Sequence, residues 1–189
     1  MSDEKKETKD TKDENLQEKG LLFLSGEIDR ENVRRIQEDI LRANIKARLP
    51  FLQMLISSPG GSVMDGFGLI DLMAWSKIPF ATTGIGTVAS MALLVLMAGQ
   101  KGRRGVTPNS TLLSHRFSGM SLGNYSDMLA RRKMEDLLHE RVVTHYLKHT
   151  KLRDRAEVER TLLRDVDTWL TPDEALECGM IDAIHGALQ

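Results

Sequence analysis

Three kinds of side chain at separate points of the chain could together carry out nucleophilic catalysis. Ser90 is the one hydroxyl within the apolar run VASMALLVLMAG, and a buried hydroxyl without a partner costs about 1–3 kcal/mol. His115 follows the apolar segment TLLS, and Asp165 and Asp167 lie in the segment RDVDTWL. A serine nucleophile requires a base that takes its proton and a carboxylate that orients the base. These residues therefore predict a hydrolase site, provided that the fold brings them together.

Each of these residues also has a purely structural interpretation. Ser90 stands where a buried helix is predicted to begin, and serine is a common cap at that position. His115 could simply be packed or solvated, and either aspartate could cap a following helix. Thr171 is well placed to cap the segment PDEAL, which leaves Asp167 freer for another role. Asp165 remains an alternative for the acid.

The break SSPGGS, residues 57–62, joins a predicted strand to a predicted helix. Backbone N–H groups at the start of a helix lack intrahelical partners and can stabilise an oxyanion. A tight turn is the simpler interpretation of these glycines. Among the other histidines, His145 and His149 are one helical turn apart, but no third ligand accompanies them in the sequence, so no metal site is expected.

From residue 20 onward, predicted strands alternate with predicted helices. Strands are predicted at LLFLSG (21–26), FLQMLIS (51–57), IPFATTGI (78–85), TLLSH (111–115) and MIDAI (180–184). Helices are predicted after Asp29 and over residues 63–74, 89–98, 125–148, 157–163 and 172–178. This alternation predicts an α/β fold with mostly parallel strands, whose carboxyl ends are where sites gather.

Composition narrows the class of protein. The chain has 189 residues, a net charge of −1 and one cysteine, Cys178, so nucleic acid, an anionic membrane surface and a disulfide framework are not expected. Residues 1–19 carry mixed charges and are predicted to be a disordered tail, and residues 20–189 form a single domain. The charged N-terminus does not resemble a secretory signal, and the longest apolar run, residues 88–99, is too short to span a bilayer. We therefore expect a cytoplasmic protein.

Four blocks of the sequence resemble the proteolytic subunit of the ATP-dependent Clp protease, over about residues 21–184. They are SPGGSVMDGFGLIDLM, GTVASMALLVLMAGQKGRR, PNSTLLSH and DVDTWLTPDEALECGMID. The resemblance implies a crotonase-like superhelix of strand–strand–helix units, with a protruding handle helix within about residues 116–150. It also implies that Ser90 is the nucleophile, His115 the base and Asp167 the acid.

The resemblance further implies that the backbone N–H groups of Gly61 and Met91 bind the oxyanion. The residues implied to contact bound peptide are Gly60, Phe117, Gly119 and Met120. The expected activity is that of a serine endopeptidase that cleaves unfolded polypeptides to short peptides without a cofactor. The expected assembly is a homo-tetradecamer of two stacked seven-membered rings around a closed chamber, which a Clp-type ATPase unfoldase feeds.

Two other functions stay open. The chain could be a non-catalytic or gating subunit of a mixed Clp-type ring, or an acyl-CoA enzyme of the wider crotonase class. The sequence also departs from the family pattern: Arg116 and Phe117 replace the usual Gln-Pro after the histidine. Gln53 and Leu55 stand where tyrosines often wall the ATPase-docking pocket, although Trp75 offers an aromatic nearby.

Overall fold

The structure is a computed structural model that describes residues 16, 18–46, 49–116 and 123–186. Most of the predicted disordered tail and three predicted peptide contacts, Phe117, Gly119 and Met120, lie outside the described residues. The strands are β1 (Leu21–Ser25), β2 (Leu52–Ser58), β3 (Phe80–Ala89), β4 (Arg104–Val106), β5 (Thr111–Ser114), β6 (Thr168–Leu170) and β7 (Ala183–Ile184). The helices are α2 (Arg30–Lys46), α3 (Val63–Trp75), α4 (Met91–Met97), α5 (Tyr125–His149), α6 (Arg155–Thr161) and α7 (Pro172–Cys178).

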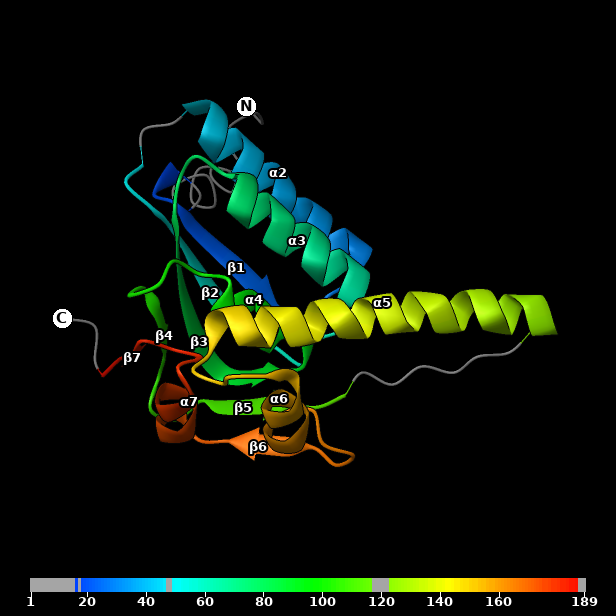
Figure 1. Ribbon diagram of the computed structural model, residues 1–189. Coiled ribbons are helices and arrows are strands. Elements are labelled where there is room, and N and C mark those ends of the chain that lie inside the picture. Colours follow the sequence, from blue (N-terminus) through cyan, green and yellow to red (C-terminus); the bar gives the residue numbers. More distant parts are fainter. Residues whose placement is uncertain (1–15, 17, 47–48, 117–122, 187–189) are drawn as a thin grey trace, which may run out of the picture.

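One sheet contains all seven strands, in the order β1-β2-β3-β4-β7, with β5 paired to the later part of β3 and β6 paired to β5. Every pairing is parallel except that of β5 with β6, which is antiparallel. The predicted α/β class with mostly parallel strands is confirmed. Helices α2 and α3 lie side by side over β1 and β2, while α5 extends far beyond the body of the molecule (Figure 1).

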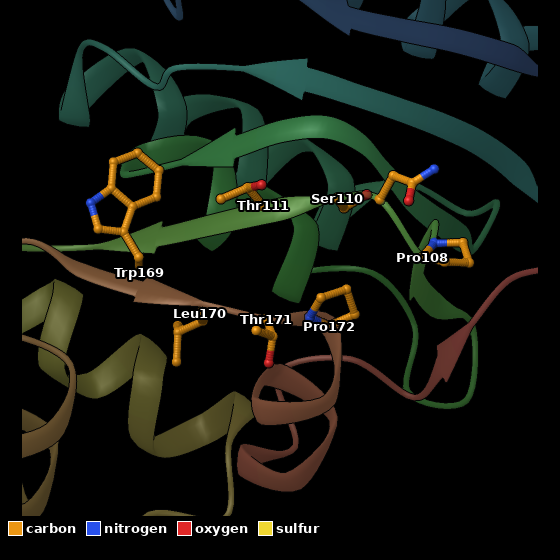
Figure 2. Close-up of a pocket in the computed structure, with 8 residues that line it drawn as sticks. Pro108, Ser110, Thr111, Trp169, Leu170, Thr171 and Pro172 are labelled. Carbon is orange, nitrogen blue, oxygen red and sulfur yellow. The ribbon is translucent and has the colours of Figure 1, made fainter.

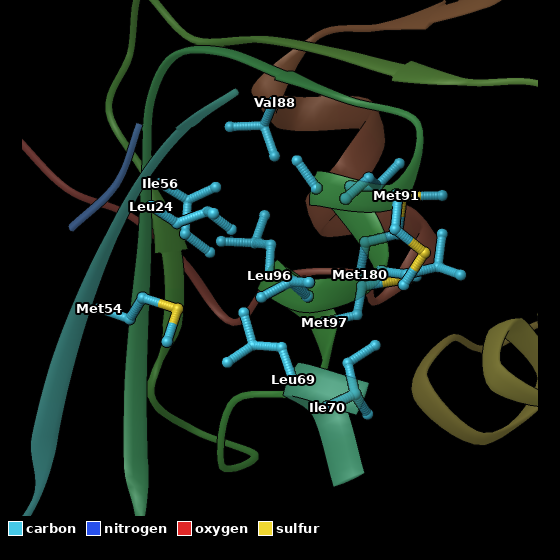
Figure 3. Packing of buried hydrophobic residues seen from close by; sticks show 14 of the residues in the cluster. Leu24, Met54, Ile56, Leu69, Ile70, Val88, Met91, Leu96, Met97 and Met180 are labelled. Carbon is cyan, nitrogen blue, oxygen red and sulfur yellow. The ribbon is translucent and has the colours of Figure 1, made fainter. Parts of the chain in front are cut away.

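The core surrounds α4, which is apolar around its whole circumference. All seven residues of α4 are buried, as the sequence predicts for a helix with no polar face. Figure 3 shows side chains of β1, β2, β3 and α3 packed around this helix. Because α4 begins directly after Ser90, the core fixes the position of that serine.

The sequence-based boundaries differ from the structure around Ser90. The strand predicted over 78–85 runs from Phe80 to Ala89, and the helix predicted over 89–98 begins at Met91. The reason is that β3 pairs with two neighbours in turn: Thr82–Gly84 with β4, and Thr87–Ala89 with β5. Pairing with β5 keeps the chain extended up to the residue before Ser90.

Two short strands were not predicted. In β4, Arg104 is 4% exposed, and its guanidinium donates to the Asp182 carboxylate and to the backbone carbonyls of His149 and Gly179. A buried arginine interrupts the apolar pattern that identifies a strand in a sequence. Its charge is paired with the carboxylate of Asp182. The other missed strand, β6, has only three residues, one of which is the exposed Trp169.

Helix α5 divides into two parts. Its C-terminal half packs on the body through Leu138, Val142, Val143, His145 and Tyr146, all buried. Large apolar residues of its N-terminal half are exposed, namely Tyr125, Met128, Leu129, Met134 and Leu137. The apolar side chains of α5 are therefore covered only where the helix lies on the body.

Candidate active site

Ser90 occupies a sharp turn between a strand and a helix. Its φ of 55° and ψ of −123° make it the one non-glycine residue with positive φ in the described part of the chain. Such a conformation costs about 1–3 kcal/mol and persists only where surrounding structure enforces it. Here the Ser90 N–H donates to the carbonyl of Leu113 in β5 at 2.8 Å, and the side chain makes no capping hydrogen bond to α4. The helix-cap interpretation of Ser90 is wrong, since its hydroxyl points elsewhere.

That hydroxyl meets His115. The Ser90 Oγ and the His115 Nε2 are 2.8 Å apart, because Ala89 and Leu113 are paired in the β3–β5 register and both strands end at the same edge of the sheet. For the hydroxyl to donate, Nε2 must be the unprotonated ring nitrogen. The ring proton is then on Nδ1, on the other side of the imidazole.

The aspartate that faces Nδ1 is Asp167. Its Oδ1 is 3.3 Å from the His115 Nδ1, and its side chain is about half exposed. The antiparallel register pairs Ser114 with Thr168, so the next pair outward is His115 with Asp167. Asp165 instead lies 3.9 Å from the Arg116 guanidinium and is 94% exposed. Thr171 caps α7 with a full capping box, as predicted, so Asp167 is not needed there.

The two glycines after Pro59 lie directly behind this turn. A Cβ added at Gly60, where φ is +92°, would be 2.7 Å from the Ala89 carbonyl oxygen and 2.8 Å from the Ser90 Cβ. A Cβ added at Gly61 would be 2.4 Å from the carbonyl oxygen of Ile28. A side chain at Gly60 would push this loop away from the serine, and a side chain at Gly61 would push it away from Ile28, which explains why both residues are glycine.

The two predicted oxyanion donors are the backbone N–H groups of Gly61 and Met91. Within the described residues, no hydrogen bond from the Gly61 or the Met91 N–H is found. In the pairing with Ile28, the bonds on either side of Gly61 run from the Ile28 N–H to Gly60 and from the Ser62 N–H to Ile28. Two unpaired N–H groups beside a nucleophile are what an oxyanion site requires.

A small apolar hollow opens beside the Ser90 and His115 side chains. Its lining consists of Val63, Ser90, Met91, Leu94, His115, Val142 and Tyr146. Two of these residues come from α5, so the base of the protruding helix forms one wall. With a volume of about 20 Å³, the hollow has room for about one water molecule next to the hydroxyl of Ser90.

A larger hollow lies along the β5–β6 ribbon (Figure 2). Trp169 stands at one end of it and is 57% exposed, while Pro108 and Pro172 lie at the other end. Trp169 is paired with Leu113, so its side chain lies on the same face of the ribbon as His115 and Asp167. Sequence reasoning missed this hollow because it depends on the unpredicted strand β6.

His145 and His149 do not form a metal site. Their ring centroids are 4.3 Å apart with the ring planes tilted by 34°, and the His145 Nε2 donates to the Leu94 carbonyl at 2.9 Å. Burial lowers the pKa of His145 to about 3 and that of His149 to about 4, with nearby charges acting in the same direction. In the described part of the chain, no group of three or more metal-ligating side chains is present. Nor is any described helix both long and apolar enough to cross a membrane.

Comparison with known proteins identifies similar sequences. A sequence profile described as Clp protease matches residues 4–187. The chain is also similar to the ATP-dependent Clp protease proteolytic subunit of Deinococcus radiodurans, with 32% identity over 166 residues. That alignment covers 87% of this chain and 79% of the relative.

Proposed function

This chain belongs to the Clp protease family, and from that premise we propose that it is a serine endopeptidase in which Ser90, His115 and Asp167 are the catalytic residues. The observation that carries the proposal is the contact geometry of these residues: 2.8 Å from the Ser90 Oγ to the His115 Nε2, and 3.3 Å from the His115 Nδ1 to Asp167. Family membership supports a protease role, and this geometry supports the serine mechanism.

In the acylation step, the Ser90 Oγ attacks the carbonyl carbon of the scissile peptide bond while its proton passes to the His115 Nε2. The carbonyl oxygen gains a negative charge, which the N–H groups of Gly61 and Met91 stabilise. His115 then gives the proton to the leaving amine, the C–N bond breaks, and an acyl-serine remains. A general base supplies typically 10²–10⁴ in rate, and one oxyanion donor about 10²–10³.

Water completes the cycle by the same route. His115 takes a proton from the water, the hydroxide attacks the acyl carbon, and Ser90 leaves with the proton that His115 returns. Asp167 holds the ring so that Nδ1 carries a proton throughout and stabilises the imidazolium that forms transiently. The side chain of Asp167 is half exposed, so its ability to orient the His115 ring depends on how firmly the backbone at Asp167 is held.

We further propose that the active form is a tetradecamer of two heptameric rings, fed by a Clp-type ATPase. The exposed apolar residues at the distal end of α5 support the assembly, because apolar surface of this kind on a protruding helix usually meets a partner. Leu138 is buried against its own chain, so the exposed Leu137 is the better position at which to test assembly. The name of the Deinococcus relative, which includes the word ATP-dependent, supports the ATPase partner.

Labelling with a fluorophosphonate tests the catalytic proposal, because the reagent reacts with activated serines. Intact-mass analysis of the wild-type protein should show one adduct per subunit, and peptide mapping should place it on Ser90. Ser90→Ala should show no adduct and no hydrolysis of fluorogenic peptides, while its native mass stays equal to that of the wild-type assembly. A wild-type protein that neither reacts nor hydrolyses would favour the non-catalytic ring subunit instead.

A further inference from the structure

The residues on either side of His115 hold the segment that leads to Asp167. The Ser114 Oγ donates to the carbonyl of Leu162 at 2.7 Å, and the Arg116 Nε donates to the carbonyl of Leu163 at 2.5 Å. These two carbonyls are consecutive in the chain. The end of α6 is therefore attached to the end of β5 at two adjacent points, directly beside the histidine.

The attachment through Ser114, the inner of the two, is part of a buried hydrogen-bond network. Ser114 is fully buried, and its Oγ also lies 2.7 Å from the Tyr146 hydroxyl of α5. Because the single proton of Ser114 goes to Leu162, the Tyr146 hydroxyl is the donor in this second bond. Burial raises the pKa of Tyr146 to about 12, so the phenol keeps that proton at any pH at which the fold is stable.

The outer attachment is the hydrogen bond from Arg116 to the Leu163 carbonyl. Leu163 itself is buried, and its N–H donates to the carbonyl of Val158 at 3.1 Å. The Arg116 side chain is about half exposed, and its second contact, with Asp165, is a loose one at 3.9 Å. Residues 163–167 belong to no helix or strand, so no regular pairing holds them. The hydrogen bond from Arg116 to Leu163 links the start of this segment to the residue after His115, and β6 fixes its end.

We propose that Arg116 is a positioning residue that keeps Asp167 opposite the His115 Nδ1. This inference rests on the proposed function, and it adds a residue that touches neither the substrate nor a reacting atom. Arg116 acts through the backbone: it fixes Leu163, the segment keeps its path, and the half-exposed carboxylate stays in place.

The first test compares Arg116→Ala with the wild-type assembly on a fluorogenic peptide. Loss of a charge-assisted hydrogen bond that acts only through Asp167 should lower kcat about tenfold and leave KM unchanged. Arg116→Lys, which keeps a charged donor, should recover part of kcat. Arg164→Ala removes an equal charge from the same segment at an exposed position and should leave kcat at the wild-type value. Thermal melting checks that all three variants are folded.

A double-mutant cycle separates positioning from a general structural role. In an Asp167→Asn background, Arg116→Ala should have no further effect on the rate of fluorophosphonate labelling at Ser90, because the carboxylate that it positions is absent. An undiminished tenfold loss in that background, or an Arg116→Ala variant with wild-type kcat, would overturn the positioning role while the serine mechanism stands. A wild-type protein without activity or labelling would overturn the proposed function and this inference together.

Discussion

Acid should destabilise this protein through His145, a histidine that takes no part in the proposed chemistry. The ring is 7% exposed and donates one hydrogen bond, from Nε2 to the Leu94 carbonyl. Burial is the main cause that lowers its pKa to about 3, and the neighbouring His149 and Lys148 act in the same direction. In the unfolded chain a histidine titrates near pH 6.5. The unfolded chain therefore binds a proton across a range of pH in which the folded chain does not.

The sign and size of the effect follow from this difference. Stability is fully present above about pH 6.5 and falls as the pH decreases from there towards the folded pKa of about 3. Each pH unit within that window removes about 1.4 kcal/mol per histidine, so lowering the pH to 5 should cost about 2 kcal/mol from His145 alone. His149, with a pKa of about 4, adds a smaller loss in the same direction, since it is only partly buried and solvent screens it.

The measurement is urea unfolding at pH 7.5 and pH 5.0, at one protein concentration because assembly contributes to stability. His145→Gln keeps a donor for the Leu94 carbonyl and removes the titration, so its free energy of unfolding should change less between the two pH values. Equal losses in the wild-type protein and His145→Gln would refute the reasoning.

Three other predictions concern the site and its partners. Asp167→Asn should lower kcat by up to about 10⁴-fold, the loss known for such a change in a serine protease triad, whereas Asp165→Asn should change kcat little. The reverse result would show that Asp165, not Asp167, is the acid. Gly60→Ala should abolish peptide hydrolysis while assembly persists, because its Cβ would lie 2.8 Å from the Ser90 Cβ; full turnover would show that the loop can shift freely. Degradation of a folded, tagged substrate with a generic Clp-type ATPase should be slow. Aromatic residues of a docking pocket contribute about 2–4 kcal/mol each, and Trp75 is the one aromatic proposed to take their place. A rate equal to that of a protease paired with its own ATPase would contradict this.

The sequence was sufficient for the parts of the fold that have regular periodicity. β1, β2 and β5, the long helix α5 and the buried helix α4 were all predicted near their observed positions, because an apolar pattern reports burial directly. β4 was missed because its buried Arg104 is satisfied by partners distant in sequence, chiefly Asp182 and the carbonyl of His149. No local pattern can show that a charge will be paired across 78 residues.

The site was only partly accessible from the residues. Ser90 and His115 stood out by type and position, but the sequence alone left Asp165 and Asp167 as alternatives for the acid. The β5–β6 register places Asp167 opposite His115, and it depends on a strand too short to recognise. The backbone conformation of Ser90 and the contact of Arg116 with Leu163 likewise arise only when three distant segments pack together.

The presence of all the proposed catalytic groups in a single chain has a genetic consequence. Ser90 and His115 directly follow β3 and β5, Asp167 directly precedes β6, and Gly61 and Met91 belong to the same chain, so one subunit supplies all five of the proposed catalytic groups. In the proposed ring, a mixture of intact and Ser90→Ala copies would have as many working sites as it has intact copies. An inactive allele expressed beside the wild-type gene should therefore reduce total turnover in proportion to its share, and should not act as a dominant poison of the whole assembly.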